Sequence, residues 1–173
     1  MPATYTLISS NVLTTSAASV TFSAIPATYT DLVLRISARK DGGGNTFKVQ
    51  FNSDTATNYS NTVLTGNSSA ASSTRNTSQV YVRVFGANES TFTANSFGSS
   101  EVYIPSYTVS QNKPIGNFGV SENNSAAADA AFINATAGLW QNTAAITSIV
   151  ITDPAAGNFV SGSSFYLYGI SNA

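Results

Sequence analysis

The side chains of this 173-residue chain that could carry acid–base chemistry are its carboxylates, because the chain contains neither histidine nor cysteine. General acid–base catalysis most often uses histidine, and thiol catalysis and the usual zinc sites need cysteine or histidine. Glycoside hydrolysis needs only two carboxylates, so a polysaccharide depolymerase is the enzyme class that the composition allows. The eight carboxylates are Asp31, Asp41, Asp54, Glu89, Glu101, Glu122, Asp129 and Asp153. Most of them lie in predicted turns, where short acidic side chains serve the backbone, and we therefore expect a protein that is not an enzyme.

Two groups of polar residues offer oxygen ligands of the kind that calcium prefers. One group is Asn52, Asp54 and Asn58, and the other is Asp41 with Asn45. Neither group has the spacing of an EF-hand loop, and Asx turns account for both groups more simply. We expect neither a metal nor a cofactor.

Charge is scarce in this chain. Charged residues make up only 9% of it, against a usual share of about 25%. Ser, Thr and Asn supply more than a third of the residues, which predicts a surface solvated by hydroxyls and amides. The seven cations are scattered, whereas nucleic-acid binding requires clustered Lys and Arg. No run approaches the roughly 20 apolar residues that cross a bilayer, and no secretory signal precedes the first strand, so we expect neither nucleic acid nor membrane as a partner.

Residues 25–39 (IPATYTDLVLRISAR) contain the clearest structural pattern. Leu32, Leu34 and Ile36 recur at every second position, whereas a helix needs apolar residues three and four apart. The pattern predicts a strand with one face on a core. The glycine-rich residues 40–45 follow, and residues 46–52 alternate again, so the two runs are predicted to pair as a hairpin.

Similar short runs continue along the chain. They cover residues 4–9, 19–24, 79–85, 96–104, 115–121, 146–152 and 163–170. Residues 129–140 are compatible with a helix or a strand, and their Thr and Gly favour the strand. Residues 53–78 are almost entirely polar, which predicts a long surface loop with one short edge strand at 62–65. The spacing of runs and turns predicts an all-β protein, an antiparallel β-sandwich in a single domain over residues 1–173.

Aromatic residues on outward faces are the candidate binding residues. One face of each sheet in a sandwich is normally polar, so outward aromatic side chains indicate contact with a second protein or a sugar ring. The alternative is that loops fold over these side chains and bury them. The candidates are Tyr81, Arg83 and Phe85 on one strand, Phe92 and Phe97 in the next loop, and Tyr103, Tyr107 and Trp140 near strand ends.

Several segments resemble small virion structural proteins of tailed bacteriophages, especially those of cyanophages and related aquatic phages. The matching segments are residues 5–9, 20–39, 51–54, 59–60, 139–147, 157–159 and 165–170. The resemblance implies a jelly-roll-like β-sandwich on the outside of the particle. It carries over no catalytic residues.

The resemblance leads to two functional hypotheses. The first is a capsid decoration or cement protein, made in the host cytoplasm and located on the virion surface, that binds the major capsid protein or another virion protein. We expect it to be a homo-oligomer, with a trimer favoured over a dimer. The second is a tail or head fibre module that binds host cell-surface glycans, with Trp140 or Tyr107 stacking on sugar rings.

Overall fold

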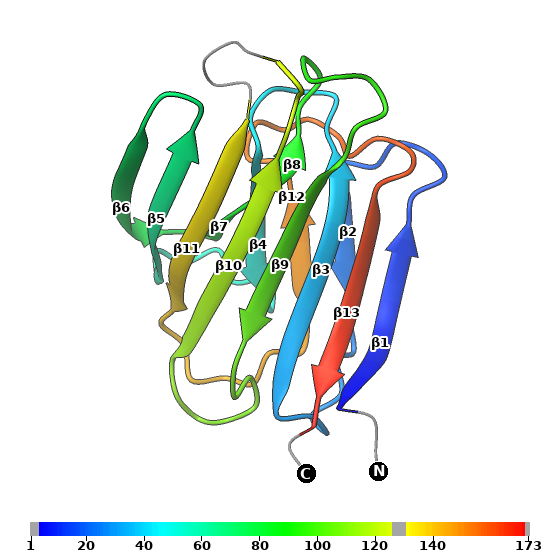
Figure 1. Cartoon of the computed structure of the whole chain (residues 1–173). Helices are drawn as coiled ribbons and strands as arrows, with labels where there is room; N and C mark the ends of the chain where they lie inside the picture. The colour runs from blue at the N-terminus through cyan, green and yellow to red at the C-terminus, as the bar shows by residue number, and fades with distance from the viewer. Residues whose placement is uncertain (1–3, 126–130, 172–173) are drawn as a thin grey trace.

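Strand β3 (Asp31–Arg39) lies in the interior of the larger of two β-sheets in the computed structural model, which describes residues 4–125 and 131–171 (Figure 1). The alternation predicted for this strand is confirmed, since Leu32, Leu34 and Ile36 are buried while Arg35 and Ser37 are exposed. Both neighbours of β3 run antiparallel to it. Because β3 pairs with β13 on one edge and with β9 on the other, it fixes the register of both neighbours.

The larger sheet has eight strands along one path. In spatial order they are β1 (Tyr5–Val12), β13 (Ser164–Ile170), β3, β9 (Gly98–Ile104), β10 (Lys113–Ser121), β11 (Phe132–Trp140), β5 (Tyr59–Asn67) and β6 (Ala71–Gln79). The short β8 (Ala87–Asn88) pairs in parallel with β3, and every other strand pair is antiparallel.

The smaller sheet has four strands, in the order β2 (Ser19–Phe22), β12 (Ile149–Thr152), β4 (Thr46–Phe51) and β7 (Val82–Phe85). It packs behind the larger sheet in the view of Figure 1. The residues that the structure describes form no helix, and so none that could cross a membrane. The predicted all-β fold, an antiparallel β-sandwich in a single domain, is confirmed.

The core lies between the two sheets. The larger sheet contributes the inward side chains of β3, and the smaller sheet contributes Phe47, Val49 and Phe51 of β4. Trp140 at the end of β11 completes an aromatic cluster with Phe51 and Tyr59. Burial of this apolar surface is the main stabilising term for a fold without disulfides.

The prediction of a long polar loop at residues 53–78 is wrong. Residues 59–79 form the β5–β6 hairpin, which extends the larger sheet by two nine-residue strands. Most side chains of this hairpin are polar, and only Tyr59, Asn61 and Val63 are buried. Its sequence therefore lacks the apolar alternation by which a strand is predicted. Backbone pairing with β11 holds the hairpin in place instead.

The predicted hairpin between residues 25–39 and 46–52 is also wrong. Strand β3 belongs to the larger sheet and β4 to the smaller one, and the glycine-rich connection crosses between the two layers. Apolar residues would alternate along both strands whether the strands paired with each other or joined different sheets. The choice is made by distant strands, because β3 pairs with β13 and β9, whereas β4 pairs with β12 and β7.

Gly119 marks a close approach between the two sheets. A Cβ atom at Gly119 would lie 2.1 Å from the backbone oxygen of Phe85, at the end of β7. We expect Gly119→Ala to lower the free energy of unfolding by about 1–3 kcal/mol, because two backbone segments would have to separate. Gly116→Ala is the matched control in the same strand, since a Cβ there meets nothing within 4 Å. Urea unfolding of both variants checks this, and equal losses would contradict it.

Candidate interaction surface

The outer face of the larger sheet, turned away from the core, carries an unusual number of exposed apolar side chains. Nine large apolar residues are exposed in the part of the chain that the structure describes, and eight of them lie on this face. We call these eight residues the apolar face: Tyr5, Leu7, Val12, Leu64, Tyr103, Phe118, Val120 and Ile133. The ninth, Val109, lies in the connection from β9 to β10.

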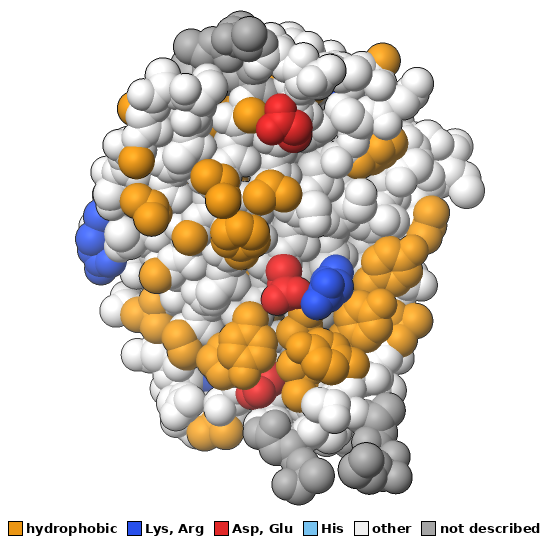
Figure 2. Space-filling view, in the orientation of Figure 1, with side chains coloured by type: hydrophobic (Ala, Val, Ile, Leu, Met, Phe, Trp, Pro, Cys, Tyr) orange, Lys and Arg blue, Asp and Glu red, His pale blue; other side chains and the backbone are white. Residues whose placement is uncertain are grey.

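The strand register brings Leu64, Phe118, Val120 and Ile133 together, because directly opposed residues of antiparallel strands share a face. Tyr5, Leu7 and Val12 lie on the same face but on the edge strand β1. Phe118 on β10 is opposite Ala135 on β11, which in turn is opposite Leu64 on β5. In the next row Val120 is opposite Ile133. Figure 2 shows the resulting group of apolar side chains spread over this side of the molecule.

An ion pair lies within the same face. Arg35 Nη2 is 2.6 Å from Glu101 Oε2, and the register places Glu101 opposite Phe118. The two charges compensate each other, so the face presents apolar and hydroxyl groups around a locally neutral centre (Figure 2). Such a surface resembles the core of a protein interface, which is depleted in unpaired charge.

The face is uneven. A groove of about 430 Å³ is lined by residues that include Arg35, Ser99, Phe118 and Tyr166. A second hollow, of about 230 Å³, has an almost wholly apolar lining that includes Leu64, Phe118 and Ile133. Phe118 therefore stands between two hollows, as an anchor that a complementary surface can enclose.

Tyr103 is held rigidly at one end of the apolar face. Its hydroxyl donates to Asp31 Oδ2 at 2.7 Å, and Asp31 Oδ1 accepts the Ser106 backbone N–H at 2.8 Å. The hydrogen bond to Asp31 is the main cause of the raised pKa of the Tyr103 hydroxyl. A fixed aromatic ring loses little conformational entropy when it forms a contact, which favours it as an interface residue.

The structure separates the eight predicted binding residues. Only Tyr103 belongs to the apolar face. Phe85, Phe92, Tyr107 and Trp140 are buried, with exposed fractions of 8%, 4%, 0% and 0%. For these four the alternative interpretation, burial inside the molecule, is the correct one.

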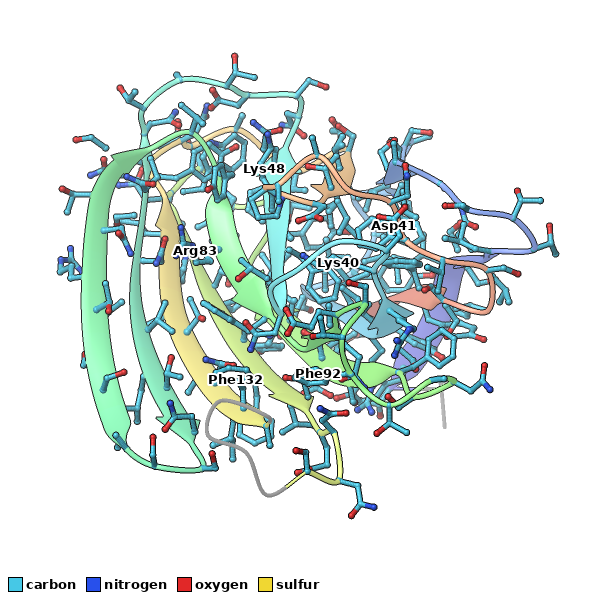
Figure 3. The ribbon with its side chains drawn as sticks, turned by 90° about the horizontal axis from the view of Figure 1, so that it is seen from above. Lys40, Asp41, Lys48, Arg83, Phe92 and Phe132 are labelled. Carbon is cyan, nitrogen blue, oxygen red and sulfur yellow. The ribbon has the colours of Figure 1, made fainter. Side chains whose placement is uncertain are left out.

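The three remaining candidates, Tyr81, Arg83 and Phe97, are partly buried. Arg83 is opposite Lys48 on the smaller sheet, and the Lys48 ammonium lies 5.5 Å from the Tyr81 ring (Figure 3). Phe97 packs near Gly162. None of the three is among the exposed large apolar residues of the described chain, and their role in binding stays a prediction.

No protein-family model matches, and neither the curated proteins nor the solved structures contain a significant match. The function is therefore inferred from the chemistry of the apolar face and from the resemblance noted in the sequence.

The seven carboxylates within the described residues have hydrogen-bond or ion-pair partners. Asp54 Oδ1 accepts the Ala56 backbone N–H, as the predicted Asx turn requires, and Asp41 accepts two hydrogen bonds from Asn158. None of the four hollows found on this side of the sheet is lined by two carboxylates, the arrangement that a glycosidase needs. Within residues 4–125 and 131–171 no cluster of acidic residues could hold a metal ion, and Asp129 lies outside the described residues.

Proposed function

We propose that this protein is a non-enzymatic decoration protein of a tailed-phage particle. It adheres to the outside of the assembled capsid through the apolar face and binds the major capsid protein or another virion protein there. The observation that carries the proposal is that eight exposed large apolar side chains share one sheet face, four of them in a single group on β5, β10 and β11. Soluble proteins rarely leave such a surface to water unless it binds something.

A modest interface is enough for this function. Anchors such as Phe118 and Ile133, each about half exposed, would contribute up to roughly 1.5–3 kcal/mol each on full burial. A protein that binds the assembled lattice but not its separated subunits stabilises the lattice by mass action, by about 2.7 kcal/mol per site at 100 times the Kd. Binding at many equivalent sites adds up these small stabilisation energies over the whole particle.

The test compares binding of variants to capsids that lack the protein. We expect Phe118→Ser and Ile133→Ser each to weaken binding by about 30-fold or more, because these side chains are the central anchors. Tyr81→Ser, immediately before β7 of the smaller sheet, is the matched control and should bind normally. The melting temperature should change little in any of the three, since none of these side chains lies in the core.

Two results would remove the proposal. One is that the purified wild-type protein fails to bind capsids that lack it. The other is that deleting the protein leaves particle resistance to heat and osmotic shock unchanged. Equal losses for Phe118→Ser and Tyr81→Ser would move the interface away from the apolar face.

The second candidate is a fibre module that binds host glycans, and the tyrosines of the same face favour it. Tyr166 lines the groove beside Arg35 and Glu101, so an aromatic ring and polar groups lie together as sugar recognition requires. A glycan array with the wild-type protein and Tyr166→Ala tests it. A signal that Tyr166→Ala abolishes supports this candidate, and a blank array for the wild-type protein counts heavily against it.

A further inference from the structure

Two of the seven cations of this chain lie side by side on the outer face of the smaller sheet. Lys48 on β4 is directly opposite Arg83 on β7, and directly opposed residues of antiparallel strands share a face. Val82 and Val84, on either side of Arg83, are fully buried, so Arg83 and Lys48 point away from the core. Both cations are partly buried (Figure 3). The sequence does not predict this pair, because the two strands are separated by the whole β5–β6 hairpin.

Neither member of this pair has an acidic partner. Within residues 4–125 and 131–171 neither forms an ion pair, and the Arg83 guanidinium donates no hydrogen bond there. The Lys48 ammonium lies 5.5 Å from the centre of the Tyr81 ring and likewise meets no carboxylate. The other five cations have oxygen acceptors. These five are Arg35, Arg39, Lys40, Arg75 and Lys113.

Two like charges in this position destabilise the sheet unless an anion compensates them. Directly opposed like charges on antiparallel strands repel each other. The ring of Tyr81 attracts the Lys48 ammonium as a cation–π contact, which holds the ammonium but leaves its charge uncompensated. A carboxylate that meets both cations would replace the repulsion by charge-assisted hydrogen bonds.

We propose that Lys48 and Arg83 together bind one carboxylate of a partner protein. The planar guanidinium can hold both oxygens of a carboxylate, and the ammonium adds a further donor from the neighbouring strand. The residues around the pair on this face are uncharged. They are Thr21, Gln50, Val150 and Thr152. The partner therefore presents an isolated aspartate or glutamate among uncharged groups.

Nucleic acids and acidic polysaccharides fit this face less well than a protein does. Both carry charges repeated along the polymer, so their further charges would lie against the uncharged residues of β2 and β12. Binding of such a polymer relies on many cations that displace its counterions, whereas this site offers Lys48 and Arg83 alone. The charge pattern thus favours a single carboxylate.

The site does not depend on the proposed function. The outer face of the smaller sheet and the apolar face lie on opposite sides of the sandwich (Figure 1). A protein docked on a capsid through the apolar face keeps Lys48 and Arg83 turned away from that contact. The two faces can therefore hold two partners at once.

Nuclear magnetic resonance of the full chain tests the site with a defined probe. The probe is acetyl-glutamate amide, and acetyl-glutamine amide is its uncharged counterpart. We expect the glutamate probe to shift the Arg83 side-chain N–H signals and the backbone amides of β4 and β7 in a saturable way. The glutamine probe should bind about tenfold more weakly, because hydrogen bonds between charged groups are stronger.

Variants with one charge removed test which residues form the site. Arg83→Gln and Lys48→Gln should each weaken binding of the glutamate probe about tenfold. Arg83→Gln should also melt about 1–3 °C above the wild type at low salt, because it ends the repulsion of Lys48. Arg75→Gln is the matched control, since it removes an exposed cation from the larger sheet and should leave binding unchanged.

Three results would overturn the proposal. One is that the glutamate probe causes no saturable shift in the wild-type protein. Another is that Arg83→Gln and Lys48→Gln bind the probe as tightly as Arg75→Gln does. The third is that oligothymidylate or oligogalacturonate causes larger shifts at the same concentration of anionic groups, which would assign the site to a polyanion instead of a protein.

Discussion

Replacement of Asp153 by asparagine is expected to lower the free energy of unfolding by about 3–5 kcal/mol, because it leaves a buried ammonium without its counterion. Lys40 Nζ lies 2.8 Å from Asp153 Oδ1, and the two side chains are 1% and 0% exposed. Lys40 Nζ also donates to the backbone oxygens of Thr46 and Gly43, at 3.0 and 3.3 Å. Lys40 of this pair lies beside Asp41 in the view of Figure 3.

The control for this prediction removes both charges. A double variant with Lys40→Met and Asp153→Leu should recover most of the lost stability, since a well-packed apolar pair often replaces a buried ion pair at little cost. Urea unfolding of the single and double variants measures both effects. A loss below about 1 kcal/mol for Asp153→Asn would show that carbonyl oxygens alone can hold the ammonium.

Replacement of Trp140 by alanine should cost about 3–5 kcal/mol of unfolding free energy, the usual range for removal of a buried aromatic ring. The indole stacks against Tyr59 with ring centroids 6.2 Å apart and lies 5.5 Å from the Phe51 ring. Its Nε1–H donates to Asp54 Oδ2 at 2.8 Å. Thermal unfolding of Trp140→Ala checks the magnitude, and a stable Trp140→Ala variant that had lost only glycan binding would contradict it.

The stability that Asp54 contributes at this site depends on pH. Burial raises the pKa of the Asp54 carboxyl, but hydrogen bonds from Asn58, Ala56 and Trp140 outweigh it and hold the pKa below 3.8. Asp54 therefore stabilises the fold at pH values above 3.8, and this stabilisation is lost as the pH falls through the lowered pKa. Trp140→Phe keeps a ring but removes one donor, so its acid unfolding should begin at a higher pH than that of the wild type.

Strand β10 shows why the apolar face could not be found from the sequence. Phe118 and Val120 alternate with Asn117 and Gly119, and the usual interpretation of such a pattern turns the apolar pair inward. In the structure the strand is turned the other way. Asn117 faces inward because its Oδ1 accepts the Phe85 backbone N–H at 2.9 Å, and only glycine at 119 leaves room for the Phe85 backbone.

Trp140 and Tyr107 show that the burial of a side chain, like its exposure, could not be predicted from the sequence. Their positions near strand ends allowed either exposure or burial, and the decision rests on residues far away in the chain. Tyr107 donates its hydroxyl hydrogen to the backbone oxygen of Pro26, and Trp140 meets Asp54. Nothing within a few residues of either side chain identifies these partners.

The sequence by itself determined that this is an all-β sandwich, which residues of most strands share a face, and that histidine and cysteine chemistry is absent. Only the tertiary structure decided which faces are covered, which sheet β3 and β4 each join, and that residues 59–79 form a hairpin with an open edge. The physical reason is that a period of two is a local property of the backbone. Whether a face meets water or a second sheet depends on strands far away in the chain, as when β3 pairs with β13.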